Sequence, residues 1–424
     1  MISLSAIHTA SQNLQGVAKV SPLEYSQRLS EQYNAKIYLK REDLQAVRSF
    51  KIRGAYNYIF SLSGEQKSRG VVCASAGNHA QGVAYSCAKL GIKGVIFMPT
   101  VTPNQKIEKV KYFGGEFVKI ELVGKTFDET SLISQQYCDD NDMVYVHPFN
   151  DKTVMAGQGT IGLEISEQLI GFNDDINSDI SADFVVCAIG GGGLIGGVGS
   201  WFKQTSPKTK IIGIESEGAR SMYNSFTSNT PSKVLCPDTF CDGIAVMQAS
   251  QNNFELCKEV VDQSFVAPEG KVATDMIEMY QKDGIIVEPS GALPVSALDQ
   301  LCDKYEIANK TIVLVICGGN NDISRYPDII ERSLIWLGKK KYFIVNFAQK
   351  SGQLKDLLNN VLGANDDITR FEYIKKTNRE KGPALVGIEL GDSTDYKQLL
   401  TKMSKQKIDY QEIMTTDLIY KYLI

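Results

Sequence analysis

Short apolar runs alternate with stretches of helical spacing from the N-terminus to about Ile330. This alternation predicts parallel strands joined by helices, and therefore an open α/β sheet covered on both faces. Two helices have clear ends: one should run from Asn78 to Leu90 before Gly91, and another should open at Thr102-Pro103 and end at Gly114-Gly115. The predicted strands are Val71–Ala74, Gly94–Met98, Phe117–Leu122, Met143–Val146, Phe184–Ile189, Ile211–Glu215 and Thr311–Ile316.

The pattern changes beyond Ile330. Segment 333–341 ends in three lysines and is predicted to be a linker, so residues 1–332 and 342–424 should form separate domains. The order of elements after the linker is βαββαβ, which is the ferredoxin-like unit. These elements are a strand Tyr342–Phe347, a helix Gly352–Leu362, strands Ile368–Ile374 and Ala384–Leu390, a helix Tyr396–Met403 and a short apolar tail to Ile424.

Composition narrows the class of protein. The chain has 45 basic and 49 acidic residues, a formal net charge of −4, so nothing global favours nucleic acid or an anionic membrane as a partner. Apolar residues make up 43% and charged residues 22%, which are ordinary globular values. The nine cysteines are scattered without a CxxC pair and indicate reduced thiols, and none of the three histidines has zinc-ligand spacing, so we expect no metal site.

Neither the N-terminus nor the apolar segments predict a membrane location. Met1–Gly16 lacks the basic start and apolar stretch of a signal peptide. Phe184–Phe202 carries no charge but holds seven glycines, which argue against a membrane span. We therefore expect a cytoplasmic protein.

The segment Ser49–Ala55 contains a candidate nucleophile. Lys51 follows Phe50 at the start of an apparent helix, where its ammonium could be partly desolvated. Desolvation lowers a lysine pKa and makes the neutral amine available as nucleophile or base. Taken locally, a solvated lysine on an amphipathic helix is the more common case.

Two loops that follow strands are candidate anion sites. The turn Ser75-Ala76-Gly77-Asn78 opens a helix, so its free N–H groups could bind a carboxylate or phosphate; a plain helix cap explains it equally well. Gly190-Gly191-Gly192-Gly193-Leu194 can turn consecutive N–H groups around a phosphate. The same glycines, with Gly196, also satisfy a GxGxxG dinucleotide pattern, and Glu215 stands where a ribose-binding acid belongs.

Two further residues follow apolar runs. Cys317 comes directly after the strand Thr311–Ile316, and Glu288 precedes a proline. Alone, each fits a structural role, as a small buried side chain and as a turn residue. Together with the lysine, the anion turn and the glycine loop, they are the components of a pyridoxal-phosphate site, in which lysine binds the aldehyde and the loop binds the phosphate.

In their order along the chain, these motifs resemble those of fold-type II pyridoxal-phosphate enzymes, and among them biosynthetic threonine dehydratases with a C-terminal ACT-like regulatory domain. The motifs are Ser49–Ala55, Ala74–Gly82, Gly190–Leu194, Asp242–Val246, Glu288–Ala292 and Cys317–Asp322.

The resemblance implies a role for each site residue. Lys51 would bind the cofactor covalently and remove the α-proton, and Asn78 would bond the cofactor's ring oxygen. Gly190, Gly191, Gly192, Gly193 and Leu194 would hold the phosphate. Ser75, Ala76, Gly77 and Asn78 would bind the substrate carboxylate, with Glu288 near the ring. Cys317 would face the pyridine nitrogen, where many biosynthetic members have serine and catabolic serine/threonine dehydratases often have cysteine.

The resemblance also implies conversion of L-threonine to 2-oxobutanoate and ammonia, activity on L-serine, a homotetramer, and isoleucine or valine as effectors. The C-terminal unit departs from its relatives, which often read Phe-Pro-x-Arg-Pro-Gly-Ala-Leu where this chain has Phe347 to Leu354 without both prolines and the arginine. Three alternatives stay open: a catabolic serine/threonine dehydratase, an NAD-dependent oxidoreductase using the GxGxxG pattern, and a catalytically silent amino-acid sensor.

Overall fold

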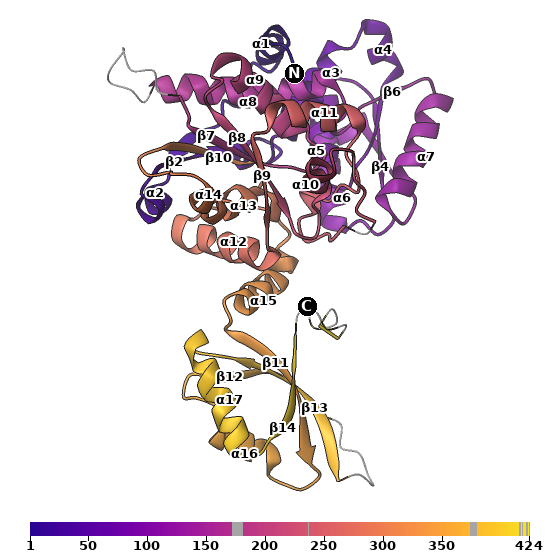
Figure 1. Cartoon of the computed structure of the whole chain (residues 1–424). Helices are drawn as coiled ribbons and strands as arrows, with labels where there is room; N and C mark the ends of the chain where they lie inside the picture. The colour runs from indigo at the N-terminus through magenta and orange to yellow at the C-terminus, as the bar shows by residue number, and fades with distance from the viewer. Residues whose placement is uncertain are drawn as a thin grey trace. The chain divides into compact units, whose positions relative to one another are not determined.

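The computed structural model describes residues 1–171, 181–235, 237–373, 380–414, 417, 419–420 and 423. They form two compact units, Met1–Pro268 with Met279–Asn321, and Glu269–Glu278 with Asp322–Ile424. The first unit holds two sheets with covering helices, and the second holds an antiparallel sheet (Figure 1). The predicted α/β class is confirmed. In the part of the chain described, no helix has the length and apolar character needed to cross a bilayer.

The larger sheet of the first unit has six strands in the order β1-β2-β10-β7-β8-β9. All neighbours are parallel except β1, which pairs antiparallel with β2. The strands are β1 (Leu23–Tyr25), β2 (Lys36–Arg41), β7 (Phe184–Ala188), β8 (Lys210–Ser216), β9 (Gln263–Ala267) and β10 (Thr311–Ile316). The uncharged stretch Phe184–Phe202 forms β7, the glycine loop and most of α9.

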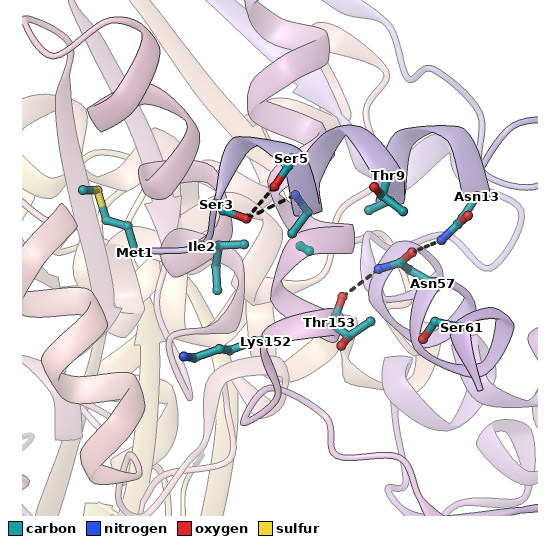
Figure 2. A pocket seen from close by; sticks show the side chains of 13 residues that line it. Met1, Ile2, Ser3, Ser5, Thr9, Asn13, Asn57, Ser61, Lys152 and Thr153 are labelled. Carbon is teal, nitrogen blue, oxygen red and sulfur yellow. Dashed lines mark hydrogen bonds between the residues drawn. The ribbon is translucent and has the colours of Figure 1, made fainter. Parts of the chain in front are cut away.

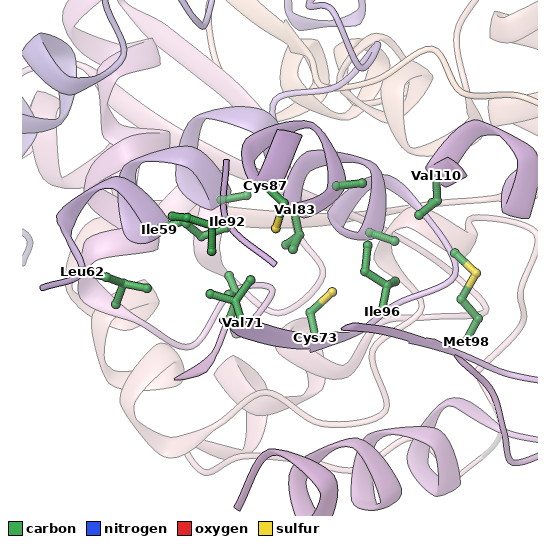
Figure 3. Packing of buried hydrophobic residues seen from close by; sticks show 14 of the residues in the cluster. Ile59, Leu62, Val71, Cys73, Val83, Cys87, Ile92, Ile96, Met98 and Val110 are labelled. Carbon is green, nitrogen blue, oxygen red and sulfur yellow. The ribbon is translucent and has the colours of Figure 1, made fainter. Parts of the chain in front are cut away.

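The smaller sheet is parallel throughout, in the order β5-β4-β3-β6. Its strands are β3 (Val71–Ala74), β4 (Gly94–Met98), β5 (Val118–Leu122) and β6 (Val144–Tyr145). Figure 3 shows the core between this sheet and the helices on one face, where Val71 and Ile96 pack with Ile59 and Val83. We call this sheet and its helices the small lobe, and the six-stranded sheet and its helices the large lobe.

The helices of the first unit mostly begin and end where their capping residues predict. Gly91 ends α5 in the left-handed conformation at φ 66°. The helix expected to open at Thr102 begins two residues later, because Pro103 takes an extended conformation and stands at the N-cap. The helices are α1 (Leu4–Asn13), α2 (Gln27–Tyr33), α3 (Lys51–Ser61), α4 (Gly64–Arg69), α5 (Asn78–Leu90), α6 (Asn104–Gly114), α7 (Phe127–Asp140), α8 (Lys152–Gly171), α9 (Gly193–Thr205), α10 (Ser221–Ser228), α11 (Gln251–Val260), α13 (Pro289–Ser296) and α14 (Leu298–Lys304). Helix α12 (Glu269–Asp283) is divided between the units, with Glu269–Glu278 in the second.

Strands β1, β2 and β9 were not predicted from the sequence. In β2 the apolar pattern is interrupted by Lys40 and Arg41, yet both side chains are buried. Lys40 Nζ lies 2.6 Å from a carboxylate oxygen of Glu164, and Arg41 pairs with Asp43 at 2.9 Å. A charge that is neutralised by a distant residue looks like a surface residue in the sequence, which is why hydropathy missed this strand.

A buried ion cluster lies two residues beyond Lys51 on α3. Arg53 Nη2 lies 2.7 Å from Glu42 Oε1 and Arg53 Nη1 lies 2.6 Å from Glu164 Oε1, while Lys40 pairs with Glu164. Thr160 and Ser21 add hydrogen bonds to Arg53 and Glu42. The cluster, defined by Lys40, Glu42, Arg53 and Glu164, fastens the first turn of α3 to β2 and to α8.

The second unit has the predicted ferredoxin-like order of elements and the sheet order β12-β13-β11-β14, with antiparallel neighbours. Segment 333–341 contains the end of α15 and the first two residues of β11, and Ile374 of a predicted strand lies outside the described residues. The elements are α15 (Tyr326–Trp336), β11 (Lys340–Ala348), α16 (Gln353–Asn360), β12 (Asp367–Tyr373), β13 (Lys381–Glu389), α17 (Tyr396–Lys405) and β14 (Asp409–Ile413).

Candidate active site

Lys51 is the first residue of α3, and its amine is held inside the first unit. Nζ donates a hydrogen bond of 2.9 Å to the carbonyl of Pro148 and lies 5.2 Å from the centre of the Phe50 ring. Burial lowers the pKa of this amine to about 8, against the opposing effects of Cys317 and Glu288. An amine with this pKa has a substantial neutral fraction near neutral pH and can act as a nucleophile or base.

The turn Ser75–Asn78 joins β3 to α5 and stays partly exposed, so a ligand could reach it. The Ser75 hydroxyl accepts a hydrogen bond from the Gly77 N–H, and Gly77 is the N-cap of α5. The first N–H groups of a helix lack intrahelical acceptors and lie at the positive end of its dipole. The turn is therefore built to receive an anion.

Asn78, Glu288 and Asn320 form a closed set of hydrogen bonds. Asn78 Nδ2 donates to both oxygens of Glu288, at 2.8 and 3.0 Å. Asn320 Nδ2 donates to Asn78 Oδ1 at 2.8 Å, and the Asn320 N–H donates to Glu288 Oε2 at 3.2 Å. Burial raises the pKa of Glu288 and Asp242 raises it further, while the bonds from Ser290 and Asn78 act in the opposite direction. These hydrogen bonds fix the orientation of the Asn78 amide in the site.

Cys317 follows β10 and is fully enclosed. Its Sγ donates to the carbonyl of Ser290 at 3.3 Å and lies 3.7 Å from the Ser290 hydroxyl. Burial raises the pKa of the Cys317 thiol, and the neighbouring Glu288 raises it further. The side chain is therefore a neutral thiol and not a thiolate.

The glycine loop follows β7, and its close packing explains the glycines. A Cβ on Gly191 would lie 2.4 Å from the Phe149 ring, and one on Gly190 would lie 2.9 Å from the Ile244 backbone. Gly192 has φ +87°, which side chains rarely adopt, and caps α9. Backbone N–H groups line this loop at a helix N-terminus, as a phosphate site requires.

The structure argues against a dinucleotide site, because the acidic residue that would bind the ribose is not available. Glu215 is buried, and its carboxylate accepts hydrogen bonds from the Met222 and Tyr223 N–H groups at the start of α10. Burial raises the pKa of Glu215 to about 8. A carboxyl group committed to capping a helix in the core cannot bind a ribose hydroxyl at the surface of a cleft.

Several residues around Lys51 were not predicted from the sequence. Pro148 accepts the hydrogen bond of the amine, and Phe149 lies against the glycine loop with its ring centre 6.0 Å from Lys51 Nζ. His147 accepts the N–H of Asn150, and burial together with Lys51 lowers its pKa to about 4. All three follow β6, so the strand-end rule, applied to this short strand as to the others, would have found them.

One surface pocket lies elsewhere in the first unit. It has a volume of about 490 Å³ and is lined by residues of α1, α3 and α8, including Ser3, Asn13 and Lys152 (Figure 2). Asn57 bridges this region by accepting from Asn13 and donating to the Thr153 carbonyl. None of the predicted site residues lines it.

Two protein families match this chain. Residues 14–318 match the family described as pyridoxal-phosphate dependent enzyme, and residues 331–423 match the C-terminal regulatory domain of threonine dehydratase. The chain is 46% identical over 423 residues to L-threonine dehydratase biosynthetic IlvA of Halalkalibacterium halodurans, covering 100% of this chain and 99% of the relative. It is also 46% identical to the protein of the same description from Bacillus subtilis, covering 100% and 98%.

Solved structures give the same fold. The processed form of threonine deaminase isoform 2 from Solanum lycopersicum has a TM-score of 0.72 and 38% identity, covering 78% of this chain and 88% of that one. Maize serine racemase has a TM-score of 0.70 and 28% identity, covering 79% and 98%.

Proposed function

Because the chain belongs to the pyridoxal-phosphate-dependent enzymes, among the biosynthetic threonine dehydratases, we propose that it converts L-threonine to 2-oxobutanoate and ammonia by β-elimination, as the first step of isoleucine biosynthesis. The observation that carries this proposal is that the Lys51 amine, the Ser75–Asn78 turn and the glycine loop share neighbours. Phe149 packs on Gly191 with its ring centre 6.0 Å from Lys51 Nζ, and Glu288, whose charge acts on Lys51, accepts from Asn78 of the turn. The family match explains all three, whereas an oxidoreductase would leave Lys51 and the turn without a role.

The residues present fit pyridoxal phosphate. The Lys51 amine suits its aldehyde, and the glycine loop at the N-terminus of α9 suits its phosphate. Asn78 Nδ2 donates to Glu288 in this structure and would turn from that carboxylate to the ring oxygen, and neutral Cys317 suits an unprotonated pyridine nitrogen. Leu194, in the first turn of α9, places one further N–H at the phosphate.

The roles proposed for the side chains are those that the family resemblance implies, and this arrangement supports them. Bound pyridoxal phosphate supplies the electron sink that stabilises negative charge on the substrate's α-carbon. Lys51 holds the cofactor and, when the amino acid takes its place, Nζ accepts the α-proton. The turn Ser75-Ala76-Gly77-Asn78 binds and orients the substrate carboxylate. Glu288, held by Asn78 and Ser290, lies beside the reacting groups. Serine offers the same leaving group and should react to give pyruvate.

The visible spectrum of the purified protein, with 2-oxobutanoate assayed in the same tube, tests the proposal. We expect a yellow protein whose absorbance shifts when threonine is added, while the oxo acid accumulates. A colourless protein that stays inert after incubation with pyridoxal phosphate would contradict the proposal. Comparing kcat/KM for threonine and serine separates the biosynthetic role from a catabolic serine/threonine dehydratase.

Replacement of Cys317 tests the neutral partner of the pyridine nitrogen. Cys317→Ser keeps a small neutral group beside Ser290 and should retain activity within about threefold. Cys317→Asp puts a carboxyl group there that favours a protonated ring, and should lower elimination by about tenfold or more. Steady-state kinetics on threonine measures both, and a harmless aspartate would refute the idea.

We further propose that 1–332 is the catalytic domain and 342–424 the ACT-like domain, in a cytoplasmic homotetramer with isoleucine as feedback inhibitor and valine as a further effector. Support comes from the regulatory-domain match to residues 331–423. Gly352, which this chain shares with the pattern of its relatives, is the N-cap of α16 at φ +92°. Threonine turnover titrated with isoleucine should fall, and a curve flat to millimolar concentrations would rule the inhibition out.

A further inference from the structure

Helix α6 of the small lobe reaches two loops of the large lobe. Lys106 Nζ lies 2.7 Å from Asp242 Oδ2, and Lys109 Nζ donates to Asn320 Oδ1 at 3.2 Å. The two lysines are three residues apart and therefore share one face of the helix. Asp242 opens the short helix Asp242–Ile244, and Asn320 follows β10.

Both partners of these lysines belong to the walls of the active site. Asn320 binds Asn78 and Glu288 directly. Asp242 precedes Gly243, where a Cβ would lie 2.6 Å from the Ser290 hydroxyl, and Ile244 of the same helix packs on Gly190. A movement of α6 would therefore displace Asn320, which binds Asn78 and Glu288, and the short helix that packs on the glycine loop.

We propose that Lys106 and Lys109 are positioning residues that hold the small lobe closed against the large lobe over the bound amino acid. The proposal rests on the proposed function for the identity of that amino acid. The Ser75–Asn78 turn of the small lobe meets Glu288 of the large lobe through Asn78, and holding the lobes together keeps this contact and excludes water from the reacting groups. The Lys106–Asp242 pair is partly exposed, at 26% and 36%, so it is weak enough to open for substrate entry and product release.

A double-mutant cycle on Lys106→Met and Asp242→Asn tests the proposal. Each single substitution should raise KM for threonine about fivefold with a smaller change in kcat, and the double variant should be no worse than either single one. Lys109→Met should raise KM similarly. Lys111→Met is the matched control, because Lys111 lies on the same helix and pairs with exposed Glu108 in a 2.9 Å surface contact. It should leave KM unchanged.

Hydrogen–deuterium exchange of residues 104–114 provides a readout that does not need turnover. Exchange in the apoprotein should increase in Lys106→Met and stay at the wild-type level in Lys111→Met. If the wild type makes no oxo acid from threonine, the proposed function fails, while the exchange result still judges the lobe contact. If the wild type turns over threonine but the two substitutions act additively on KM, or exchange is unaltered, the positioning role is wrong.

Discussion

Lys51→Ala should abolish threonine turnover, lowering kcat by about 10⁴-fold or more, because one amine serves both as the attachment point and as the base. The pKa of about 8 results from burial and leaves the amine reactive. Turnover of threonine in the presence of excess pyridoxal phosphate measures the loss. Borohydride treatment followed by mass spectrometry should fix the cofactor to wild-type protein at Lys51 and leave the variant unlabelled.

Lys111→Ala is the control for this experiment, since Lys111 is 58% exposed on the small lobe and lies on a surface helix. It should keep its activity and its borohydride label. Retained turnover in Lys51→Ala, or a label on a different lysine, would show that the base lies elsewhere and would overturn the site assignment.

The anion turn, the glycine loop and Cys317 could be predicted from the sequence because each of them comes directly after a strand. In a parallel sheet the carboxyl ends of strands meet at one edge, so the loop after β7 and Cys317 after β10, both in the six-stranded sheet, are expected to lie close together. The turn after β3 belongs to the four-stranded sheet, and it meets the large lobe through the contact between Asn78 and Glu288. The turn after β3, the loop after β7 and Cys317 after β10 each follow a continuous apolar run that is visible in the sequence. The family resemblance added the identity of the ligand, which the rule alone does not supply.

Other parts of the site depend on contacts that no local pattern reveals. Asn320 orients Asn78 from a position more than two hundred residues away, and Pro148 acts through a carbonyl that every residue possesses. The α6 contact of Lys106 with Asp242 joins two lobes. Charge and hydropathy report whether a residue prefers water, and they do not report its partner.

The buried ion cluster also depends on distant partners that no local sequence pattern reveals. Disrupting it is the second large effect that we expect, and this effect is on stability. Arg53→Met should lower the free energy of unfolding by about 3–5 kcal/mol, because it leaves Glu42 and Glu164 buried without their shared cation. Lys40, which contacts Glu164, compensates only one of the two carboxylates directly. Urea denaturation of the apoprotein, followed by circular dichroism, measures the change.

The cluster also predicts how the effects of substitutions at its residues compare and combine. Arg53→Lys keeps the charge but loses the hydrogen bonds to both carboxylates, so it should cost less than Arg53→Met and more than a surface change. Lys310→Met removes a pair with Asp183 that is 46% and 38% exposed and should cost no more than about 1 kcal/mol. Adding Glu42→Gln to Arg53→Met should restore part of the lost stability, because it removes one of the orphaned charges. A double variant that is less stable than Arg53→Met alone would mean that the hydrogen bond from Ser21 stabilises Glu42 by more than its orphaned charge costs, and that the cluster does not act through charge compensation at the start of α3.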